Sequence, residues 1–414
     1  MYIKKYIRLI ENFISLSLFK FIDAIIPLII IPYLILTVGE EKYGIYAFAY
    51  ALIFYLRNII QYGFSLSGVR MIALNKDDKK TLNTIYNNVF TTQLYLTVFC
   101  LISLLILVLF IDVFKNHYII YLFFSFTLIG ELLFPGWFFM GVEKMRFSTI
   151  VNVISKVTFA VLVFVFVKTE NDFMYIALYQ SVGFILSGLI AQYIIIKEFN
   201  INIKLANFKD VKHVLKEGVS AFLTLMSPTL YYNTSVFLVG IFGLPQYVGF
   251  MEIATKISGA FSVLNSILAM VFYPFINRNK SAIKKVKYIF ISVGLILSIT
   301  MFLLSEFLIQ LWLHKPSPEI VSIVKTLSII PFSASVISAF GVNGLMIYNK
   351  DKLYLKIVIF SSVCGLLTAL ILIPTYYYTG GAIAIVIGSC MTALLVYINN
   401  RRVMKTIKTK ANEI

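Results

Sequence analysis

Charged residues are scarce in this sequence, and their scarcity excludes an ordinary soluble protein. Only 13% of the 414 residues are charged, and acids are the rarer kind, with 19 Asp and Glu against 36 Lys and Arg. Soluble domains carry about 25% charged residues. The net charge of +17 could suggest a nucleic-acid partner. The basic residues lie in short loops between apolar segments, however, so nucleic acid is not an expected partner.

Other absences exclude further classes of protein. The three cysteines, Cys100, Cys364 and Cys390, lie singly in apolar runs, so we expect neither a disulfide framework nor a metal site. The sequence has no glycine-rich phosphate-binding loop of an ATPase. The connections between its apolar segments that would face outward are too short to hold the acceptor and the catalytic groups of a membrane-embedded polymerase or glycosyltransferase. We therefore expect no enzyme, no catalytic residue and no cofactor. The first apolar segment is too long for a cleaved signal peptide.

Long apolar runs dominate what is present. The sequence is 60% hydrophobic with a mean hydropathy of +0.89. Runs of about 20 apolar residues cross a bilayer as helices, whereas barrel strands are shorter and alternate. We therefore predict an all-α, polytopic membrane protein with twelve transmembrane helices. Their expected ranges are 12–38, 43–66, 84–111, 118–140, 146–167, 174–196, 214–241, 247–275, 288–312, 320–347, 355–376 and 380–399.

The charges of the loops alternate along the chain. Most basic residues fall in every second loop and at both termini, whereas the other loops hold only Lys42, Lys115, Lys168 and Lys315. Lysine and arginine gather on the cytoplasmic side of membrane proteins. Both termini are therefore expected in the cytoplasm.

The longest connection divides the spans six plus six. We expect an N-terminal lobe at 1–197, a cytoplasmic linker at 198–213 and a C-terminal lobe at 214–414. The linker is either an amphipathic helix on the anionic inner leaflet or a solvated basic loop. A faint repeat supports the division, since Gly39 to Gly44 after the first span resembles Gly243 to Gly249 after the seventh. Parallel halves are typical of alternating-access transporters.

The first span contains residues that a plain membrane anchor would exclude. Lys20 and Asp23 lie on one helix face and could pair, and Pro27 and Pro32 favour a bend. A charge near the bilayer centre costs about 2.5–3.5 kcal/mol, so such residues face protein or a water-filled cavity. A bent span with an inward charged face indicates a transport pathway.

Further charged residues lie within other spans. Arg57 has Asn58 and Gln61 beside it, Asn152 and Lys156 are one turn apart, and so are Glu252 and Lys256. Glu131 lies in the fourth span. Glu306 and Lys325 lie nearer span ends, where snorkelling to the outer interface explains them. The excess of basic groups suits an anionic substrate, because Lys and Arg are the usual phosphate binders.

The sequence resembles the O-antigen and polysaccharide flippases of the multidrug/oligosaccharidyl-lipid/polysaccharide (MOP) exporter superfamily. The resemblance runs from about residue 10 to 400 and rests on the order of several motifs. They are Pro27-Leu-Ile-Ile-Ile-Pro32-Tyr33-Leu34 with Gly39 and Tyr43-Gly44, Tyr62-Gly63-Phe64 before Arg70, Pro135-Gly136-Trp137 through Met145, Asn152 and Lys156, and Val248-Gly249-Phe250 through Lys256 and Tyr273-Pro274. Asp23 departs from the family pattern, in which an uncharged polar residue is common.

The resemblance implies two six-helix lobes around a central cavity, a MATE-like fold. It also implies a flippase that carries undecaprenyl-diphosphate-linked oligosaccharide from the cytoplasmic to the outer leaflet, for O-antigen or another surface polysaccharide. We then expect Lys20, Arg57, Lys156 and Lys256 to bind the diphosphate. Asp23, Glu131 and Glu252 are expected to balance their charge or to couple transport to an H⁺ or Na⁺ gradient.

The expected location is the bacterial cytoplasmic (inner) membrane, with membrane lipid and other polysaccharide-assembly proteins as further partners. Two other functions remain open at this point. One is an ion-coupled multidrug exporter of the same superfamily, whose cationic substrates would favour an acidic interior. The other is a membrane-embedded polysaccharide polymerase or glycosyltransferase.

Overall fold

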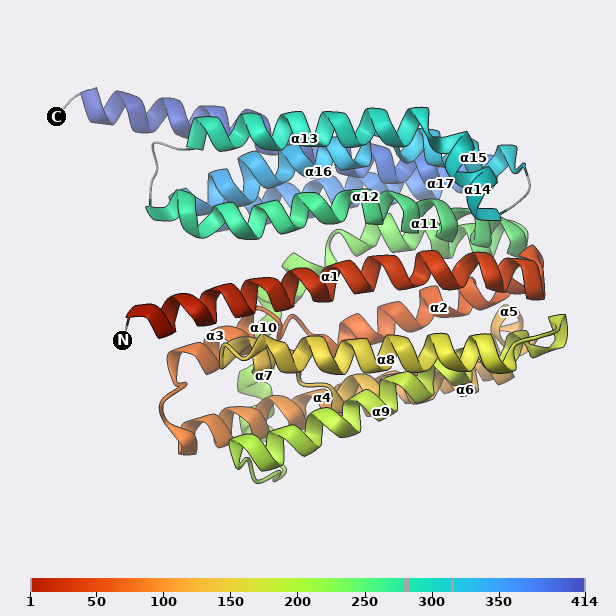
Figure 1. Cartoon of the computed structure of the whole chain (residues 1–414), viewed down its shortest axis with the longest axis horizontal. Helices are drawn as coiled ribbons and strands as arrows, with labels where there is room; N and C mark the ends of the chain where they lie inside the picture. Colours follow the sequence, from red (N-terminus) through yellow and green to blue (C-terminus); the bar gives the residue numbers. More distant parts are fainter. Residues whose placement is uncertain (1, 279–282, 314–315, 413–414) are drawn as a thin grey trace. The chain divides into compact units, whose positions relative to one another are not determined.

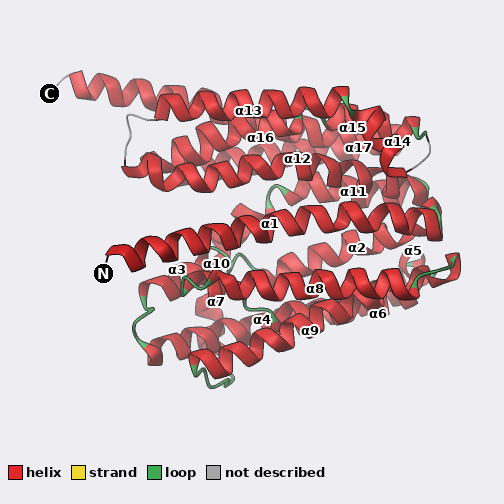
Figure 2. Cartoon of the chain, viewed as in Figure 1, coloured by secondary structure: helices red, strands yellow, loops and turns green. Residues whose placement is uncertain are grey.

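The structure is a computed structural model that describes residues 2–278, 283–313 and 316–412. Helices joined by short loops make up these residues, and no strand occurs among them (Figure 2). Within the described parts, nine helical stretches are long and apolar enough to cross a membrane by length and composition. The predicted all-α, polytopic class is thereby confirmed.

The chain divides into two compact units, Met1–Met226 and Ser227–Ile414. We call them the N-terminal and the C-terminal lobe. The N-terminal lobe contains α1 (Tyr2–Val38), α2 (Glu40–Gln61), α3 (Ser67–Leu74), α4 (Lys79–Phe110), α5 (Asp112–Lys115), α6 (Tyr118–Leu133), α7 (Gly136–Gly141), α8 (Met145–Phe166), the short 3₁₀ helix η1 (Glu170–Asp172), α9 (Phe173–Phe199) and α10 (Phe208–Met226) (Figure 1).

The C-terminal lobe is also helical throughout its described residues. It contains α11 (Thr229–Phe242), α12 (Pro245–Arg278), α13 (Ile283–Leu303), α14 (Ser305–Leu313), α15 (Pro318–Leu327), α16 (Ile330–Val336), the π-helix η3 (Ile337–Leu345), the 3₁₀ turn η4 (Met346–Tyr348) and α17 (Asp351–Asn412). Tyr377 interrupts α17 with φ 46° and ψ −119°. That interruption falls between the last two predicted spans.

Several predicted spans consist of more than one helix. The fourth span is broken at Phe134 and Pro135 into α6 and α7, and the seventh at Ser227 and Pro228 into α10 and α11. Proline explains both breaks, because it disfavours helical geometry in the residue before it. Helix α1, by contrast, is continuous through Pro27 and Pro32. The bend that these prolines favour stays a prediction.

The connection after α9 belongs to the N-terminal lobe. Three of its backbone N–H groups, those of Asn202, Lys204 and Ala206, donate to side chains of α4 at 2.7, 3.0 and 2.9 Å. Helix α10 then contacts α3 and α4. It runs through residue 214, where we expected the C-terminal lobe to begin, and the two lobes divide after Met226.

Small residues let the helices of the N-terminal lobe approach closely. A Cβ atom on Gly183 of α9 would lie 2.5 Å from the backbone oxygen of Ser155 in α8. A Cβ atom on Gly130 of α6 would lie 2.7 Å from Phe184 of α9. Contacts of this kind bring backbones together where the surrounding lipid offers no hydrophobic drive. Helix α9 is therefore held against both α6 and α8.

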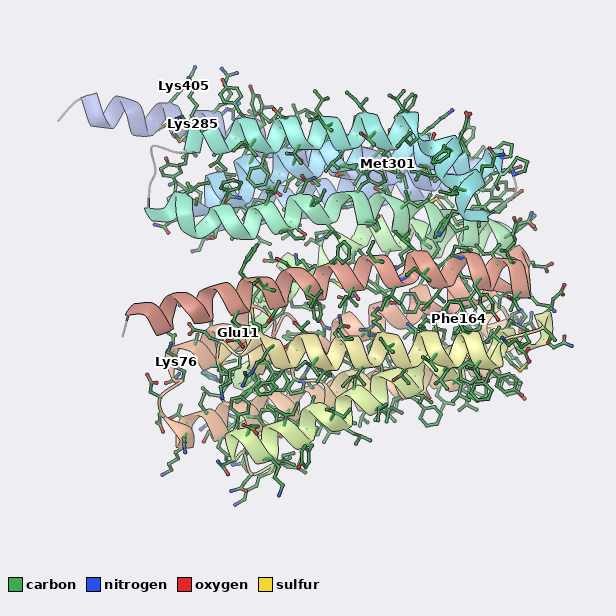
Figure 3. All side chains as sticks on the ribbon, in the orientation of Figure 1. Glu11, Lys76, Phe164, Lys285, Met301 and Lys405 are labelled. Carbon is green, nitrogen blue, oxygen red and sulfur yellow. The ribbon has the colours of Figure 1, made fainter. Side chains whose placement is uncertain are left out.

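Each lobe carries charged residues at one end. In the N-terminal lobe, Glu11 and Lys76 lie toward one end of the helices and Phe164 toward the other (Figure 3). In the C-terminal lobe, Lys285 and Lys405 lie at one end and Met301 lies farther along (Figure 3). Within each lobe, the labelled charged residues thus lie at one end of the helices.

Candidate functional site

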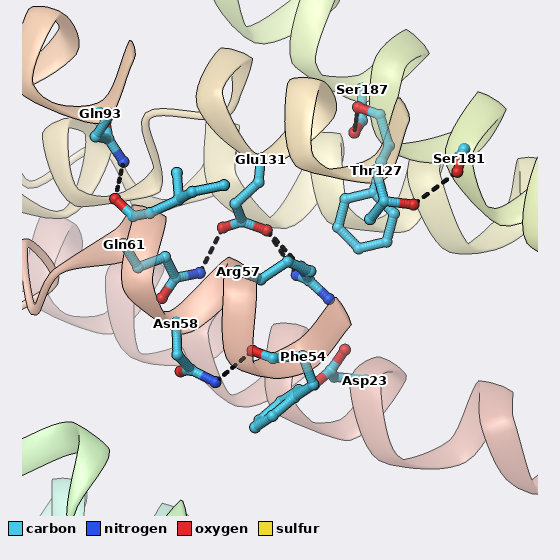
Figure 4. A network of polar contacts seen from close by, with 12 residues as sticks. Asp23, Phe54, Arg57, Asn58, Gln61, Gln93, Thr127, Glu131, Ser181 and Ser187 are labelled. Carbon is cyan, nitrogen blue, oxygen red and sulfur yellow. Dashed lines mark hydrogen bonds and ion pairs between the residues drawn. The ribbon is translucent and has the colours of Figure 1, made fainter. Parts of the chain in front are cut away.

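The most buried charges among the described side chains of the N-terminal lobe form one ion pair. The guanidinium of Arg57 in α2 donates to Glu131 of α6 through Nε and Nη2, each at 2.7 Å from Oε2. Gln61, one turn beyond Arg57, donates to the other carboxylate oxygen (Figure 4). Glu131 is only 2% exposed. Burial of an ionised group without a partner costs several kcal/mol, so each of these two charges stabilises the other in its buried position.

An aromatic ring completes this arrangement. The guanidinium carbon of Arg57 lies 4.3 Å from the centroid of Phe184 in α9. A cation over a ring gains about 0.5–2 kcal/mol. The pair therefore joins α2, α6 and α9. Asn58, which we grouped with Arg57 and Gln61, instead donates to the backbone oxygen of Phe54.

A second ion pair joins α1 to α8. Lys156 Nζ lies 3.0 Å from Asp23 Oδ1. Two further hydrogen bonds fix the same register. Thr149 donates to the backbone oxygen of Ser15 at 2.8 Å, and Tyr33 donates to the backbone oxygen of Val167 at 2.6 Å. Lys156 is largely buried, with 18% of its side chain exposed, whereas Asp23 is 53% exposed.

The expected pairing of Lys20 with Asp23 is wrong. The carboxylate of Asp23 is turned toward Lys156 of α8, because the register between α1 and α8 sets these two side chains opposite each other. Among the residues that the structure describes, Lys20 makes neither a hydrogen bond nor an ion pair. It is half-buried in α1, one turn before Asp23. Lys20 is thus a cation without a counter-ion among the described residues.

On the α8 side of the interface between α1 and α8, the described structure contains polar atoms without hydrogen-bond partners. Asn152 and Ser148 lie one and two turns before Lys156, and within the described chain the Asn152 Nδ2 and Ser148 Oγ atoms are buried with no hydrogen bond. Buried polar atoms are normally satisfied by protein or water. Water or a ligand is therefore expected beside them.

The third pair lies within the C-terminal lobe. Lys256 Nζ is 3.2 Å from Glu252 Oε1, one turn earlier on α12. The carboxylate is largely buried, with 14% of its side chain exposed, and the lysine is 35% exposed. Nearby, the half-buried Tyr232 donates to the backbone oxygen of Thr255 at 3.0 Å.

The expected site residues thus form three pairs and one single cation. Each expected acid lies against one of the expected cations. Two pairs and Lys20 belong to the N-terminal lobe, and the third pair belongs to the C-terminal lobe. A single diphosphate site would need residues of both lobes, so the convergence of all four cations stays a prediction.

Sequence reasoning missed the groups that complete the Arg57 pair. Gln61 was noticed only as a polar neighbour, and Phe184 gave no signal because aromatics make up 16% of the chain. Other buried polar pairs were also missed, among them Tyr86 with Gln192 at 2.7 Å. Only glutamine residues inside apolar runs pointed to such contacts.

These features define a polytopic helical membrane protein with charged residues paired inside its spans. Residues 9–280 match the family described as "Polysaccharide biosynthesis protein". The chain belongs to this family, in agreement with the resemblance drawn from its motifs.

Two relatives match along nearly the whole chain. The "Putative O-antigen transporter" of Escherichia coli (strain K12) is 27% identical over 404 residues, which cover 95% of this chain and 97% of the relative. A protein of the same description from Shigella dysenteriae is 26% identical over 395 residues, covering 93% and 97%. Both relatives bear the description of a transporter rather than of an enzyme.

Solved structures of the MOP superfamily share the fold. "Lipid II flippase MurJ, inward closed conformation" has a TM-score of 0.70 at 14% identity, covering 96% of this chain and 87% of that one. An inward-facing multidrug resistance MATE family transporter of the MOP superfamily has a TM-score of 0.67 at 15% identity, covering 93% and 99%. At such identities the likeness concerns the fold, and it confirms the MATE-like architecture.

Proposed function

We propose that this chain is a flippase that moves an undecaprenyl-diphosphate-linked oligosaccharide from the cytoplasmic to the outer leaflet by alternating access. Its membership of the polysaccharide biosynthesis family carries the proposal. The two O-antigen transporter relatives support it, because they align over nearly all of both chains. The flippase works in the bacterial inner membrane with both termini in the cytoplasm, as its basic loops favour.

The charges inside the N-terminal lobe suit an anionic head group. Lys20, Arg57 and Lys156 outnumber the two acids that pair there, and Lys20 has no counter-ion among the described residues. A diphosphate that enters the membrane loses hydration, and opposing charge offsets that loss. We propose that Lys20, Arg57, Lys156 and Lys256 together form the diphosphate site.

The paired acids have a role when the site is empty. Asp23, Glu131 and Glu252 then neutralise cations that would otherwise be buried alone, which is costly. An arriving diphosphate replaces the most accessible carboxylate as partner. Lys20 makes the first contact, because no carboxylate among the described residues has to release it.

We propose Asp23 rather than Glu131 as the group that couples transport to an H⁺ or Na⁺ gradient. Asp23 is 53% exposed and lies 3.0 Å from Lys156 Nζ through Oδ1. Glu131 is tied by Arg57 and Gln61 and is nearly inaccessible. Transport by an Asp23→Asn variant that stays normal at every external pH and sodium concentration would exclude Asp23 from coupling.

A multidrug exporter remains the alternative function, since transporters of that kind share the fold. Cationic drugs favour an acidic interior, whereas the paired charges and Lys20 leave the spans of the N-terminal lobe with excess positive charge. Polymerase or glycosyltransferase activity is not proposed.

Substitution of Lys20 tests the proposed function. In cells that lack their own O-antigen flippase but make its substrate, the wild-type chain should restore surface polysaccharide. Lys20→Ala should lower that polysaccharide at least tenfold at equal protein level, and Lys20→Arg should restore it because the charge is kept. The matched control is Lys42→Ala, which removes a lysine whose partner Glu170 is largely exposed.

Two results would overturn the proposed role of Lys20 in binding the diphosphate. One is wild-type surface polysaccharide in the Lys20→Ala cells. The other is undiminished binding of the lipid-linked oligosaccharide by the purified Lys20→Ala protein in nanodiscs.

A further inference from the structure

The C-terminal lobe contains a cavity that the diphosphate site does not use. It has a volume of about 560 Å³, within the ~300–1,000 Å³ of small-molecule pockets. Its polar lining consists of Glu306 and Gln310 from α14, Ser317 before α15, and Ser322, Lys325 and Thr326 from α15. All lining residues belong to one lobe and are described by the structure.

Local sequence explains why this cavity forms. Helix α15 begins sharply, with Pro318 at its first position and Ser317 before it, because proline fits the start of a helix. Residues four apart share a helix face. Glu306 and Gln310 therefore present one face of α14 to the cavity, and Ser322 with Thr326 presents one face of α15. The two helices contact each other.

The charges of the cavity cancel. Lys325 Nζ lies 2.6 Å from Glu306 Oε1 and donates a hydrogen bond to it. The paired cavity thus has no net charge to attract a phosphate or a cation. Because both side chains are well exposed, the pair contributes little stability. A neutral ligand can separate the two groups at low cost.

The remaining polar groups can bind hydroxyls. Gln310 and Ser322 are exposed and, among the described residues, their side chains make no hydrogen bond. An amide and a hydroxyl each donate and accept. The carboxylate of Glu306 accepts, and the ammonium of Lys325 donates. Ile309, Val321, Pro316 and Pro318 add apolar surface. Neighbouring hydroxyls on a ring with apolar C–H faces match this mixture.

We propose that this cavity binds a sugar ring of the oligosaccharide on the outer side of the membrane. The inference rests on the proposed function and on the orientation that places basic loops inside. The cavity lies at the end of the C-terminal lobe where the lysine-poor loops occur. The cavity receives this sugar of the head group after the lobes open outward. How well the sugar fits the cavity contributes to the choice of repeat unit.

The test measures binding of free sugars to the purified chain in nanodiscs. Galactose, mannose, rhamnose and N-acetylglucosamine are the probes, and saturation-transfer NMR is the readout. At least one sugar should bind with a Kd in the millimolar range. A double variant, Gln310→Ala with Ser322→Ala, should weaken that binding at least fivefold. Glu319→Gln, on α15 but outside the cavity, should leave it unchanged.

Both substituted side chains are exposed and without hydrogen bonds in the described structure, so these variants keep the fold, which the thermal unfolding midpoint checks. Absence of binding by every sugar, or equal binding by the double variant, overturns the inference. Displacement of the sugar by inorganic phosphate also overturns it. If the wild-type chain fails to move the lipid-linked oligosaccharide yet binds sugars at this cavity, the proposed function fails and the cavity assignment stands.

Discussion

Replacement of Glu131 by Gln removes one charge from the most buried ion pair of the N-terminal lobe. The substitution keeps the size of the side chain and leaves an oxygen that can accept from Gln61. It leaves Arg57 charged in a dry site without its carboxylate. Any loss of stability in this variant is therefore caused by the removed charge and not by a cavity.

The expected loss of stability follows from the burial of the pair. Removal of one partner of a buried ion pair costs about 3–5 kcal/mol. The retained amide oxygen and the ring of Phe184, 4.3 Å from the guanidinium, offset ~1 kcal/mol of this. A net loss of ~2–4 kcal/mol lowers the unfolding midpoint of a domain of this size by roughly 5–12 °C.

Thermal unfolding of the purified protein in detergent measures this effect. A fall in midpoint of less than 2 °C for Glu131→Gln would refute the reasoning. A second variant, Arg57→Met with Glu131→Leu, removes both charges and should recover at least half of the lost stability, since apolar residues can replace a buried pair. It should not restore surface polysaccharide, because the cation is gone.

Two further predictions concern hydrogen bonds of the N-terminal lobe. Tyr86→Phe should cost ~1–2 kcal/mol of unfolding free energy, because the buried Gln192 oxygen loses its donor. Tyr121→Phe is the control, since the Tyr121 hydroxyl has no partner in the described structure, and equal losses would contradict the prediction. Asp78 caps α4 by accepting from the backbone N–H groups of Lys80 and Thr81, and hydrogen bonds from Thr81 hold the pKa of Asp78 below its usual value. A lowered pKa means that the cap stabilises α4 above pH ~4 and is lost as pH falls through that lowered pKa. Asp78→Ala should therefore speed amide exchange at Thr81 at neutral pH, and a wild-type rate in the variant would count against the cap.

The helices could be predicted from the sequence because each span is a long apolar run. A backbone in lipid must satisfy its own hydrogen bonds, which leaves a helix as the outcome for such a run. The breaks were harder to predict. Pro135 and Pro228 end helices, whereas α1 continues through Pro27 and Pro32. Neighbouring helices decide between these outcomes, and the sequence does not show them.

The charged residues of the candidate site could be predicted, but their partners could not. A charge inside a span is conspicuous, so Arg57, Lys156 and Glu131 were all found from the sequence. Two charges three residues apart gain only ~0.2–0.5 kcal/mol on a helix. The register between α1 and α8 outweighs that gain and gives Asp23 to Lys156 instead of Lys20. The register between α1 and α8 depends on packing along the whole interface of the two helices.

The burial of the three carboxylates orders the pairs by how readily they exchange partners. The exposed fraction of the acid side chain rises from 3% in Glu131 to 14% in Glu252 and 53% in Asp23. A carboxylate that reaches water when displaced loses little, whereas one that stays buried without its cation is costly. Asp23 can therefore release Lys156 to a diphosphate, while Glu131 keeps Arg57. By this reasoning Lys20 and Lys156 contact the phosphate oxygens first, and Arg57, still paired with Glu131, adds its positive charge to the site.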